Sequence, residues 1–276
     1  MPGIELPPGI EALAPQRAKL LSIAQAAQGD PDIVGMVIKG SFALGIADEF
    51  SDLDLSLVIT DGNFDEVFAR RPQLVSAPGD VVATFTGEHV GLPRLRIVLY
   101  DDLVHVDFSY VRLGEFPNKP EDLPCRVIWE RGGLLSNRLA AATHPSPHID
   151  AAWLEARMWT WVWYTHTKIL RGELYEALNG LQLLRTWVLF PLLAVTRGQR
   201  PGGSRRAEQL VGELQEDFEA TVAAPDRPAT MKALEKCVAL YLQLADPMLE
   251  QQGVEKAERA RRPVLDALHA GLDYEP

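Results

Sequence analysis

The sequence has few of the features that mark disulfide-rich or membrane-spanning proteins. Only two cysteines, Cys125 and Cys237, occur in 276 residues, too few for a disulfide framework or a cysteine-based zinc site. No uninterrupted apolar run reaches the roughly 20 residues of a membrane span, and the longest candidate, around residues 187–196, contains Pro191. The N-terminus has no basic segment followed by an apolar one, so it does not resemble a signal peptide. We therefore expect a cytoplasmic protein with no membrane partner.

Basic residues are also outnumbered by acidic ones. The chain has 27 Lys and Arg against 38 Asp and Glu, a formal net charge of −11. Because long nucleic acids usually bind to a basic stripe, we expect no such partner here. The acidity is compatible with a cationic partner or a metal–nucleotide complex, although solubility is the simpler explanation.

The two halves of the chain have different patterns, and together they predict an α+β fold. The first half alternates short apolar strands with a few helices, and Asp101-Asp102 between two strands indicates a hairpin. We predict helices over residues 11–28 and 63–70, and strands over residues 33–39, 53–59, 94–100, 103–111 and 125–131. The composition changes near residue 145, so we expect an α/β domain over residues 1–145 and a helical bundle over 146–276.

Helical periodicity dominates the second half. We predict helices over residues 151–171, 173–197, about 205–222, 227–252 and 253–272, with RGQRPGGSRR as a loop. The tryptophans crowded between Trp153 and Trp163 are expected to lie mostly in the helical core, because large aromatic side chains dominate buried area.

Two predicted strands each combine an apolar face with a face that carries carboxylates. Side chains alternate along a strand, so Asp52 and Asp54 share one face of DLDLSLVI (residues 52–59) and the leucines share the other. In LVHVDFSYV, His105 and Asp107 share a face in the same way. If the strands are neighbours, three carboxylates converge and repel one another, and a divalent cation removes that penalty. Ligands that are all oxygen suit Mg²⁺, which commonly bridges to substrate phosphates.

Gly40-Ser41 follows the first apolar strand and opens a turn or short helix. Glycine lets the backbone approach a phosphate closely, and amide and hydroxyl groups at a helix start can hold an anion. The stretch from Gly40 to Asp54 is therefore interpreted as a triphosphate cradle followed by metal ligands. A lone Asp-x-Asp pair is most often a solvated edge, so the combination carries this interpretation.

The stretch GSFALGIADEFSDLDL resembles the signature of the DNA polymerase β-type nucleotidyltransferase superfamily, Gly-Ser-x-x-x-Gly-x-x-x-x-x-Ser-Asp-x-Asp. The motif-bearing similarity covers about residues 33–111. Residues 125–135 look like an added strand and turn of the two-domain branch that resembles aminoglycoside adenylyltransferases. Many minimal members carry arginine where this chain has Leu44, so any contact of that arginine is absent here.

The resemblance implies an enzyme that transfers a nucleoside monophosphate to a hydroxyl and releases pyrophosphate. It implies that Gly40 and Ser41 bind the triphosphate and that Asp52, Asp54 and Asp107 bind metal, with two Mg²⁺ ions and ATP as the expected donor. Asp107 is also a candidate to accept the proton of the acceptor hydroxyl. We expect a small-molecule acceptor, with aminoglycoside-type antibiotics and hence antibiotic resistance among the candidates.

In two-domain members the helical domain supplies another wall of the substrate site. The segment KILRGELYEALNGLQLLR resembles such a helical stretch, which implies Lys168 as a triphosphate contact and Glu173 as an alternative catalytic base. As alternatives, Lys168 is a solvated helix residue and Glu173 an acid favoured by the dipole of the helix that it begins.

Two other functions remain open on the sequence. The same chemistry serves nucleotidyltransferases of the toxin–antitoxin type, which modify a protein or RNA, and a vestigial site would leave a nucleotide-binding or interaction protein without catalysis. The presence of all three acids argues against a vestigial site without catalysis. The sequence leaves open the acceptor, the nucleotide preference and the oligomeric state, a homodimer included.

Overall fold

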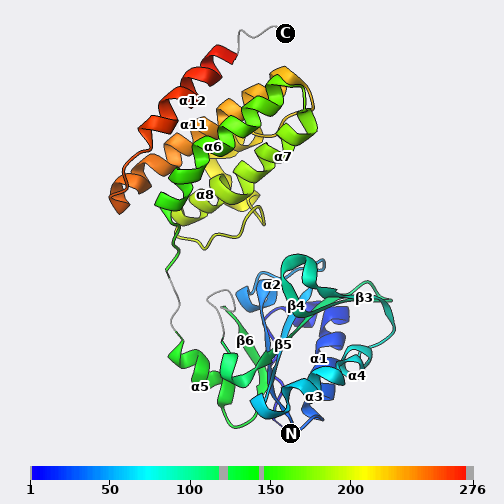
Figure 1. The fold of residues 1–276 in the computed structure, drawn as a ribbon. Coiled ribbons are helices and arrows are strands. Elements are labelled where there is room, and N and C mark those ends of the chain that lie inside the picture. The colour runs from blue at the N-terminus through cyan, green and yellow to red at the C-terminus, as the bar shows by residue number, and fades with distance from the viewer. Residues whose placement is uncertain (1, 118–123, 143–145, 272–276) are drawn as a thin grey trace. The chain divides into compact units, whose positions relative to one another are not determined.

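The chain folds into two units in the computed structural model, which describes residues 2–117, 124–142 and 146–271. The contacts divide the chain into Met1–His144 and Pro145–Pro276. The first unit contains the whole sheet and the second is helical (Figure 1).

The first unit is built on a six-stranded sheet in the order β3-β4-β5-β2-β1-β6. Its strands are β1 (Ile33–Ile38), β2 (Leu53–Ile59), β3 (Val81–Gly87), β4 (Leu92–Tyr100), β5 (His105–Arg112) and β6 (Arg126–Glu130). Its α-helices are α1 (Ala14–Gln28), α2 (Gly40–Leu44), α3 (Phe64–Ala69), α4 (Arg71–Ser76) and α5 (Leu134–Ala141). Short 3-10 turns lie at Ile10–Ala12, Asp61–Asn63, Glu88–Val90 and Leu113–Glu115. Only β2 and β5 pair in parallel, so the sheet is mixed.

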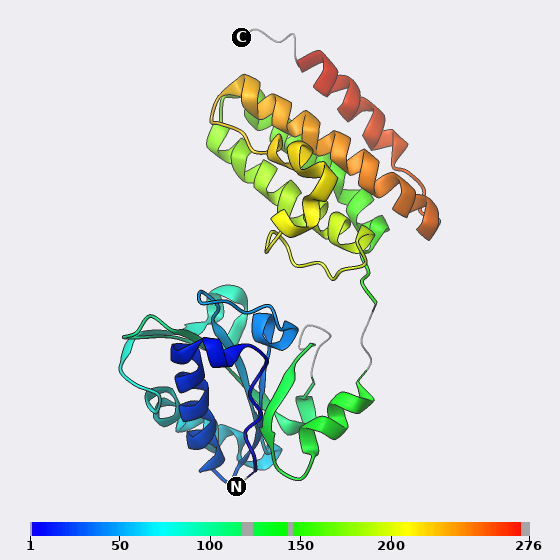
Figure 2. The same cartoon turned by 180° about the vertical axis from the view of Figure 1, so that it is seen from behind.

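Both faces of the sheet are partly covered by helices. Helices α1, α3 and α4 share a large core with Leu53, Leu55 and Leu57 of β2. A smaller cluster on the other face joins Val34, Val58 and Leu135 of α5. Figures 1 and 2 show α1 and α5 on opposite sides of the sheet. The end of β2 that carries Asp52 and Asp54 is therefore backed by a solid core on its leucine side.

The predicted strands are confirmed with small shifts in their ends, and the β4–β5 hairpin around Asp101-Asp102 is present. Three elements escaped prediction: β3, α4 and α5. Residues Val82–Phe85 of β3 are all exposed, so the strand lacks the alternation of buried and exposed residues on which the prediction relied. The two helices have only 6 and 8 residues, too short for a clear period.

The second unit packs its helices around one core. It contains α6 (Ala151–Leu170), α7 (Leu174–Leu184), a π-helical segment (Arg185–Leu189), α8 (Phe190–Thr196), α9 (Glu208–Val211), a 3-10 turn (Gly212–Leu214), α10 (Gln215–Glu219), α11 (Arg227–Gln252) and α12 (Glu258–Gly271). Trp159 is buried and Trp153 and Trp161 pack against the core, as expected, whereas Trp163 is exposed.

Two of the helical predictions are wrong in detail. The last helix begins at Glu258 and not at 253, because Gly253 adopts a left-handed conformation (φ 66°) and ends α11. The helix predicted over about 205–222 is broken into short pieces around Gly212, which has φ 51°. A glycine with a positive φ interrupts the helix at both places.

The expectation that no segment is long enough to span a membrane needs correction. Among the described residues, the continuous helical run Leu174–Thr196 passes that test by length and composition. The sequence prediction required an uninterrupted apolar run, and polar residues such as Arg185 interrupt this one. Core helices pass the same test, and 44% of the most apolar stretch of this run is buried inside the protein.

A buried carboxylate, that of Glu155 on α6, connects three parts of the helical unit. It accepts hydrogen bonds from the indole Nε1 of Trp159, the hydroxyl of Tyr241 on α11 and the backbone N–H of Ala257 just before α12. Only 3% of Glu155 is exposed. Three donors satisfy the buried carboxylate, and the carboxylate in turn holds α11 and the start of α12 against α6.

We predict that Glu155→Ala lowers the free energy of unfolding of the helical unit by about 3–5 kcal/mol, because it leaves two buried donors and one partly buried donor without an acceptor. Glu155→Gln is the matched control. Its amide oxygen can accept both N–H bonds and its amide nitrogen can donate to the Tyr241 hydroxyl, so we expect a loss below about 1.5 kcal/mol. Urea denaturation measures both. Equal stabilities of the two variants would contradict this role of Glu155.

Candidate active site

Three aspartates meet on the sheet where β2 lies beside β5. The parallel register places Asp54 directly opposite Asp107, and Asp52 lies two residues before Asp54 on the same face. Carboxylate oxygens of the three lie within 4.8 Å of one another. Thus the structure brings Asp107 next to Asp52 and Asp54, from which it is more than fifty residues distant in the sequence.

Alternation of side chains along both strands explains how carboxylates come to lie on a well-packed sheet. In β2, Leu53 and Leu55 are fully buried against the helices on the opposite face. In β5, Val106 and Phe108 are fully buried in the same core. The aspartates remain partly exposed, with side-chain exposures of 35% for Asp52 and 21% for Asp107.

His105 lies between two of the carboxylates. Its Nε2 is 3.0 Å from Asp107 Oδ1, and its Nδ1 is 3.7 Å from Asp52 Oδ2. The Nε2 contact lacks the alignment of a hydrogen bond, so we describe it as an ion pair. The close contact with Asp107, helped by the charges of Asp52 and Asp54, holds the pKa of His105 above its ordinary value, although burial acts in the opposite direction.

Gly40 and Ser41 begin α2 next to the same carboxylates. Gly40 has φ 60°, and a Cβ atom added there would overlap with Oδ2 of Asp54. Glycine is therefore needed both for the left-handed conformation and for the close approach to the carboxylate. The Ser41 hydroxyl is buried and has no hydrogen-bond partner among the described residues. The first amides of α2 lack intrahelical partners, as at any helix start.

The far end of α2 is held by a residue that the sequence did not single out. Nε of Arg126, on β6, donates a hydrogen bond of 2.8 Å to the carbonyl of Ala43. The two residues are 83 positions apart, and no local pattern relates them. Leu44, the last residue of α2, is 55% exposed.

The aspartate cluster fits a divalent cation. All three ligands are carboxylates, the donor type that Mg²⁺ prefers, and their oxygens are close enough for a modest side-chain rotation to bring them onto one ion. Each pair of carboxylates at about 5 Å repels by roughly 1–3 kcal/mol for an effective dielectric constant between about 80 and 20. His105 offsets part of this repulsion, and a bound cation would offset more.

The two candidates in the helical unit pair with each other. Lys168 Nζ is 2.6 Å from Glu173 Oε2, and Arg171 lies 3.8 Å from the other oxygen of Glu173. The hydrogen bond to Lys168 lowers the pKa of Glu173, and the same bond raises the pKa of Lys168. The described contacts thus place both residues together on the helical unit, as a charged pair.

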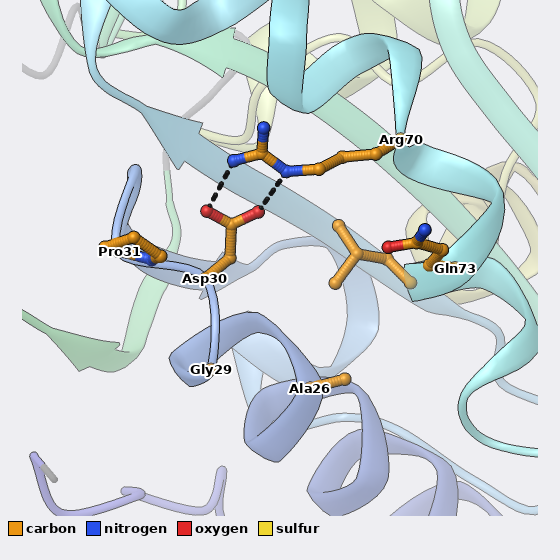
Figure 3. A pocket seen from close by; sticks show the side chains of 7 residues that line it. Ala26, Gly29, Asp30, Pro31, Arg70 and Gln73 are labelled. Carbon is orange, nitrogen blue, oxygen red and sulfur yellow. Dashed lines mark hydrogen bonds and ion pairs between the residues drawn. The ribbon is translucent and has the colours of Figure 1, made fainter.

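A separate cavity of about 430 Å³ lies between α1 and the α3–α4 segment, and none of Asp52, Asp54 and Asp107 lines it. Figure 3 shows its charged groups, Arg70 and Asp30, facing each other. Arg70 Nε and Nη2 donate to the two oxygens of Asp30, and Nη2 also donates to Asp32. These bonds lower the pKa of Asp30. The charged groups that line this cavity satisfy one another. We therefore interpret Arg70 and Asp30 as a structural ion pair that joins the end of α3 to the turn between α1 and β1.

We predict that the metal-free protein becomes less stable as pH rises through the raised pKa of His105. A raised folded-state pKa means that protonation stabilises the folded protein below the ordinary histidine value of about 6.5, and this contribution disappears as pH rises above the folded-state value. Because 40% of the ring is exposed, the effect should stay below about 1 kcal/mol.

Urea denaturation between pH 6 and 8 with a chelator present measures this effect, and His105→Gln is the comparison. The variant should show a flatter pH dependence than the parent protein. Parallel curves for the two proteins would rule out the ion pair as a source of stability.

No protein-family model matches the chain. No curated protein matches it.

Among solved structures, the chain resembles an aminoglycoside 6-adenyltransferase from Bacillus subtilis at 15% identity, over 94% of this chain and 98% of that one, with a TM-score of 0.44. It also resembles a nucleotidyltransferase-like protein from Exiguobacterium sibiricum at 13% identity, over 83% and 74% of the two chains, with a TM-score of 0.37. A putative nucleotidyltransferase from Sulfolobus solfataricus aligns at 17% identity with 43% of this chain and 88% of its own, with a TM-score of 0.26.

Proposed function

We propose that the protein is a nucleotidyltransferase that transfers a nucleoside monophosphate, AMP from ATP in the first instance, to a hydroxyl group of a small molecule. The observation that carries the proposal is the convergence of Asp52, Asp54 and Asp107 beside the Gly40-Ser41 turn. Neither feature alone is specific. Their combination provides metal ligands next to unpaired donors for a phosphate, which is what this reaction requires.

The proposed reaction is a displacement at the α-phosphorus of the nucleotide. The acceptor oxygen forms a bond to the α-phosphorus. The bond between the α-phosphorus and the oxygen that bridges it to the β-phosphate breaks, and pyrophosphate leaves. Divalent ions held by Asp52, Asp54 and Asp107, two Mg²⁺ in our proposal, would neutralise charge on the phosphates. The Ser41 hydroxyl and the first amides of α2 are suited to bind the triphosphate.

We propose that Asp107 is the base that accepts the proton of the acceptor hydroxyl. Asp107 lies within the cluster at which the metal ions are proposed to bind, whereas the alternative base, Glu173, lies on the helical unit and is held in an ion pair with Lys168. Lys168 would have to leave this pair to contact a triphosphate. We therefore propose Lys168 as a phosphate contact only in the nucleotide-bound protein.

Incubation of the full chain with Mg²⁺, an α-labelled nucleoside triphosphate and a panel of hydroxyl-bearing small molecules, aminoglycosides included, tests the proposal. We expect release of pyrophosphate and a labelled small-molecule product. Label on protein or RNA alone would favour the macromolecular acceptor instead. Failure to bind any nucleotide in the presence of Mg²⁺ would contradict the proposal and favour a protein without catalytic function.

We predict that Asp54→Asn reduces transfer by at least about 10³-fold, because it removes an anionic metal ligand from a site where charge neutralisation contributes several kcal/mol. The metal-free variant should be at least as stable as the parent, since it relieves repulsion within the cluster. Asp65→Asn is the control, because Asp65 is an exposed acid that pairs with Arg112 outside the cluster. Full activity of Asp54→Asn would refute the site.

We predict that Gly40→Ala weakens divalent-ion binding at least about tenfold, because its Cβ would displace the Asp54 carboxylate. Gly45→Ala is the matched control. Gly45 has a similar left-handed conformation (φ 72°), but nothing lies within 4 Å of an added Cβ. Both variants pay about 1–2 kcal/mol of backbone strain, and only the first disturbs the carboxylate. Calorimetric titration with Mn²⁺ measures the difference, and equal affinities would exclude the contact as the cause.

A further inference from the structure

A cavity of about 480 Å³ opens beside the aspartate cluster and lies entirely within the α/β unit. Three segments line it: the start of α1 with the residues before it, the loop that precedes β2, and the turn between β4 and β5. Asp52 belongs both to this cavity and to the cluster, and His105, which also lines the cavity, pairs with two of the cluster's carboxylates. The volume is within the range of about 300–1,000 Å³ that is usual for small-ligand sites.

Buried polar side chains of α1 hold two of these walls in place. Gln16, which is 6% exposed, donates a 3.0 Å hydrogen bond to the backbone carbonyl of Glu49 in the loop. Lys19, also 6% exposed, lies 3.1 Å from Asp102 in the turn and donates to the carbonyl of Pro78. The cavity is therefore formed by anchored segments before any ligand binds.

Two large apolar side chains of the cavity are unusually exposed. Phe50 is 87% exposed and Leu103 is 74% exposed. Leu103 also has φ 63°, a conformation that a leucine rarely adopts and that costs of order 1–3 kcal/mol. Exposed apolar surface combined with backbone strain at the rim of a cavity next to reactive groups points to a ligand that covers it.

The charges of the cavity favour a cation. Glu49, Asp52 and Asp102 line it, whereas no lysine or arginine is among its lining residues. Lys19 pairs with Asp102, and His105 lies close to both Asp107 and Asp52, so the local field is set mainly by Glu49, which has no ion pair among the described residues, and in part by Asp52. Low-dielectric walls strengthen such a field. A nucleoside triphosphate would be repelled here, but an ammonium group would be attracted.

We propose that this cavity is the acceptor subsite, and that the acceptor is a compact amphipathic organic cation that bears a hydroxyl group. Its apolar part covers Phe50 and Leu103, and its ammonium group faces Glu49. Because Asp52 is shared with the cluster, a hydroxyl on the same molecule reaches the edge where Asp107 lies. This inference rests on the proposed function: the hydroxyl oxygen bonds to the α-phosphorus, pyrophosphate leaves, and the proton passes to Asp107.

The test uses 2-amino-1-phenylethanol as the probe, since it combines a ring, an ammonium group and a hydroxyl. Its affinity for the full chain is measured by ligand-observed NMR in the presence of Mg²⁺ and a non-hydrolysable ATP analogue. We expect at least about tenfold weaker binding of 1-phenylethanol, which lacks the ammonium group. The variants Phe50→Ala and Glu49→Gln should each weaken binding of the probe at least about fivefold and leave the affinity for the ATP analogue unchanged.

Phe85→Ala and Glu66→Gln are the controls, because both residues are exposed on the same unit and neither lines the cavity. They should change neither affinity. If the probe does not bind, or if Phe50→Ala and Glu49→Gln do not change its affinity, the proposal of an acceptor subsite is overturned and the proposed function still stands. Loss of ATP-analogue binding in Phe50→Ala would also overturn it, because the cavity would then belong to the nucleotide. If the parent protein binds no ATP analogue, the proposed function itself fails.

Discussion

The parallel pairing of β2 with β5 is the constraint on which the rest of the site depends. It places Asp54 opposite Asp107 and keeps Leu53, Leu55 and Leu57 in the core on the other face. A slip of one residue would exchange the faces, burying carboxylates against the helices and exposing the leucines. The large penalty for that exchange fixes the register, so burial of the leucines and convergence of the aspartates are two results of one pairing.

Concentrating carboxylates costs stability, and the surrounding contacts limit that cost in different ways. His105 lies between Asp52 and Asp107 and carries a raised pKa, so it acts as an internal counter-charge. The acid of the neighbouring turn, Asp102, is paired with the buried Lys19 and adds little to the repulsion. Gly40 lets α2 approach Asp54 without a side chain in between. A protein selected for stability alone would have little use for this arrangement, which is consistent with a site prepared for a cation.

The helical unit is organised around a different buried charge. Glu155 accepts three hydrogen bonds and holds α11 and the start of α12 against α6, so its carboxylate has a structural role. The Lys168–Glu173 pair near the end of α6 is of another kind, since Glu173 is 44% exposed and an exposed pair contributes little to stability.

The local pattern of the sequence was sufficient to predict the strands and helices in which the spacing of apolar residues alone determines the buried face. The alternation in LDLSLVI and LVHVDFSYV predicted which side chains share a face, and the strand and helix positions followed with small shifts. Pattern failed where position in the sheet or a single backbone angle decided the structure, as in the exposed edge strand β3 and at Gly253. That β2 lies beside β5, that Arg126 holds α2 and that Phe50 and Leu103 border one cavity depend on segments far apart in the chain. Only the tertiary structure decided these contacts, because they arise from the packing of the whole unit and leave no periodic signal in any one segment.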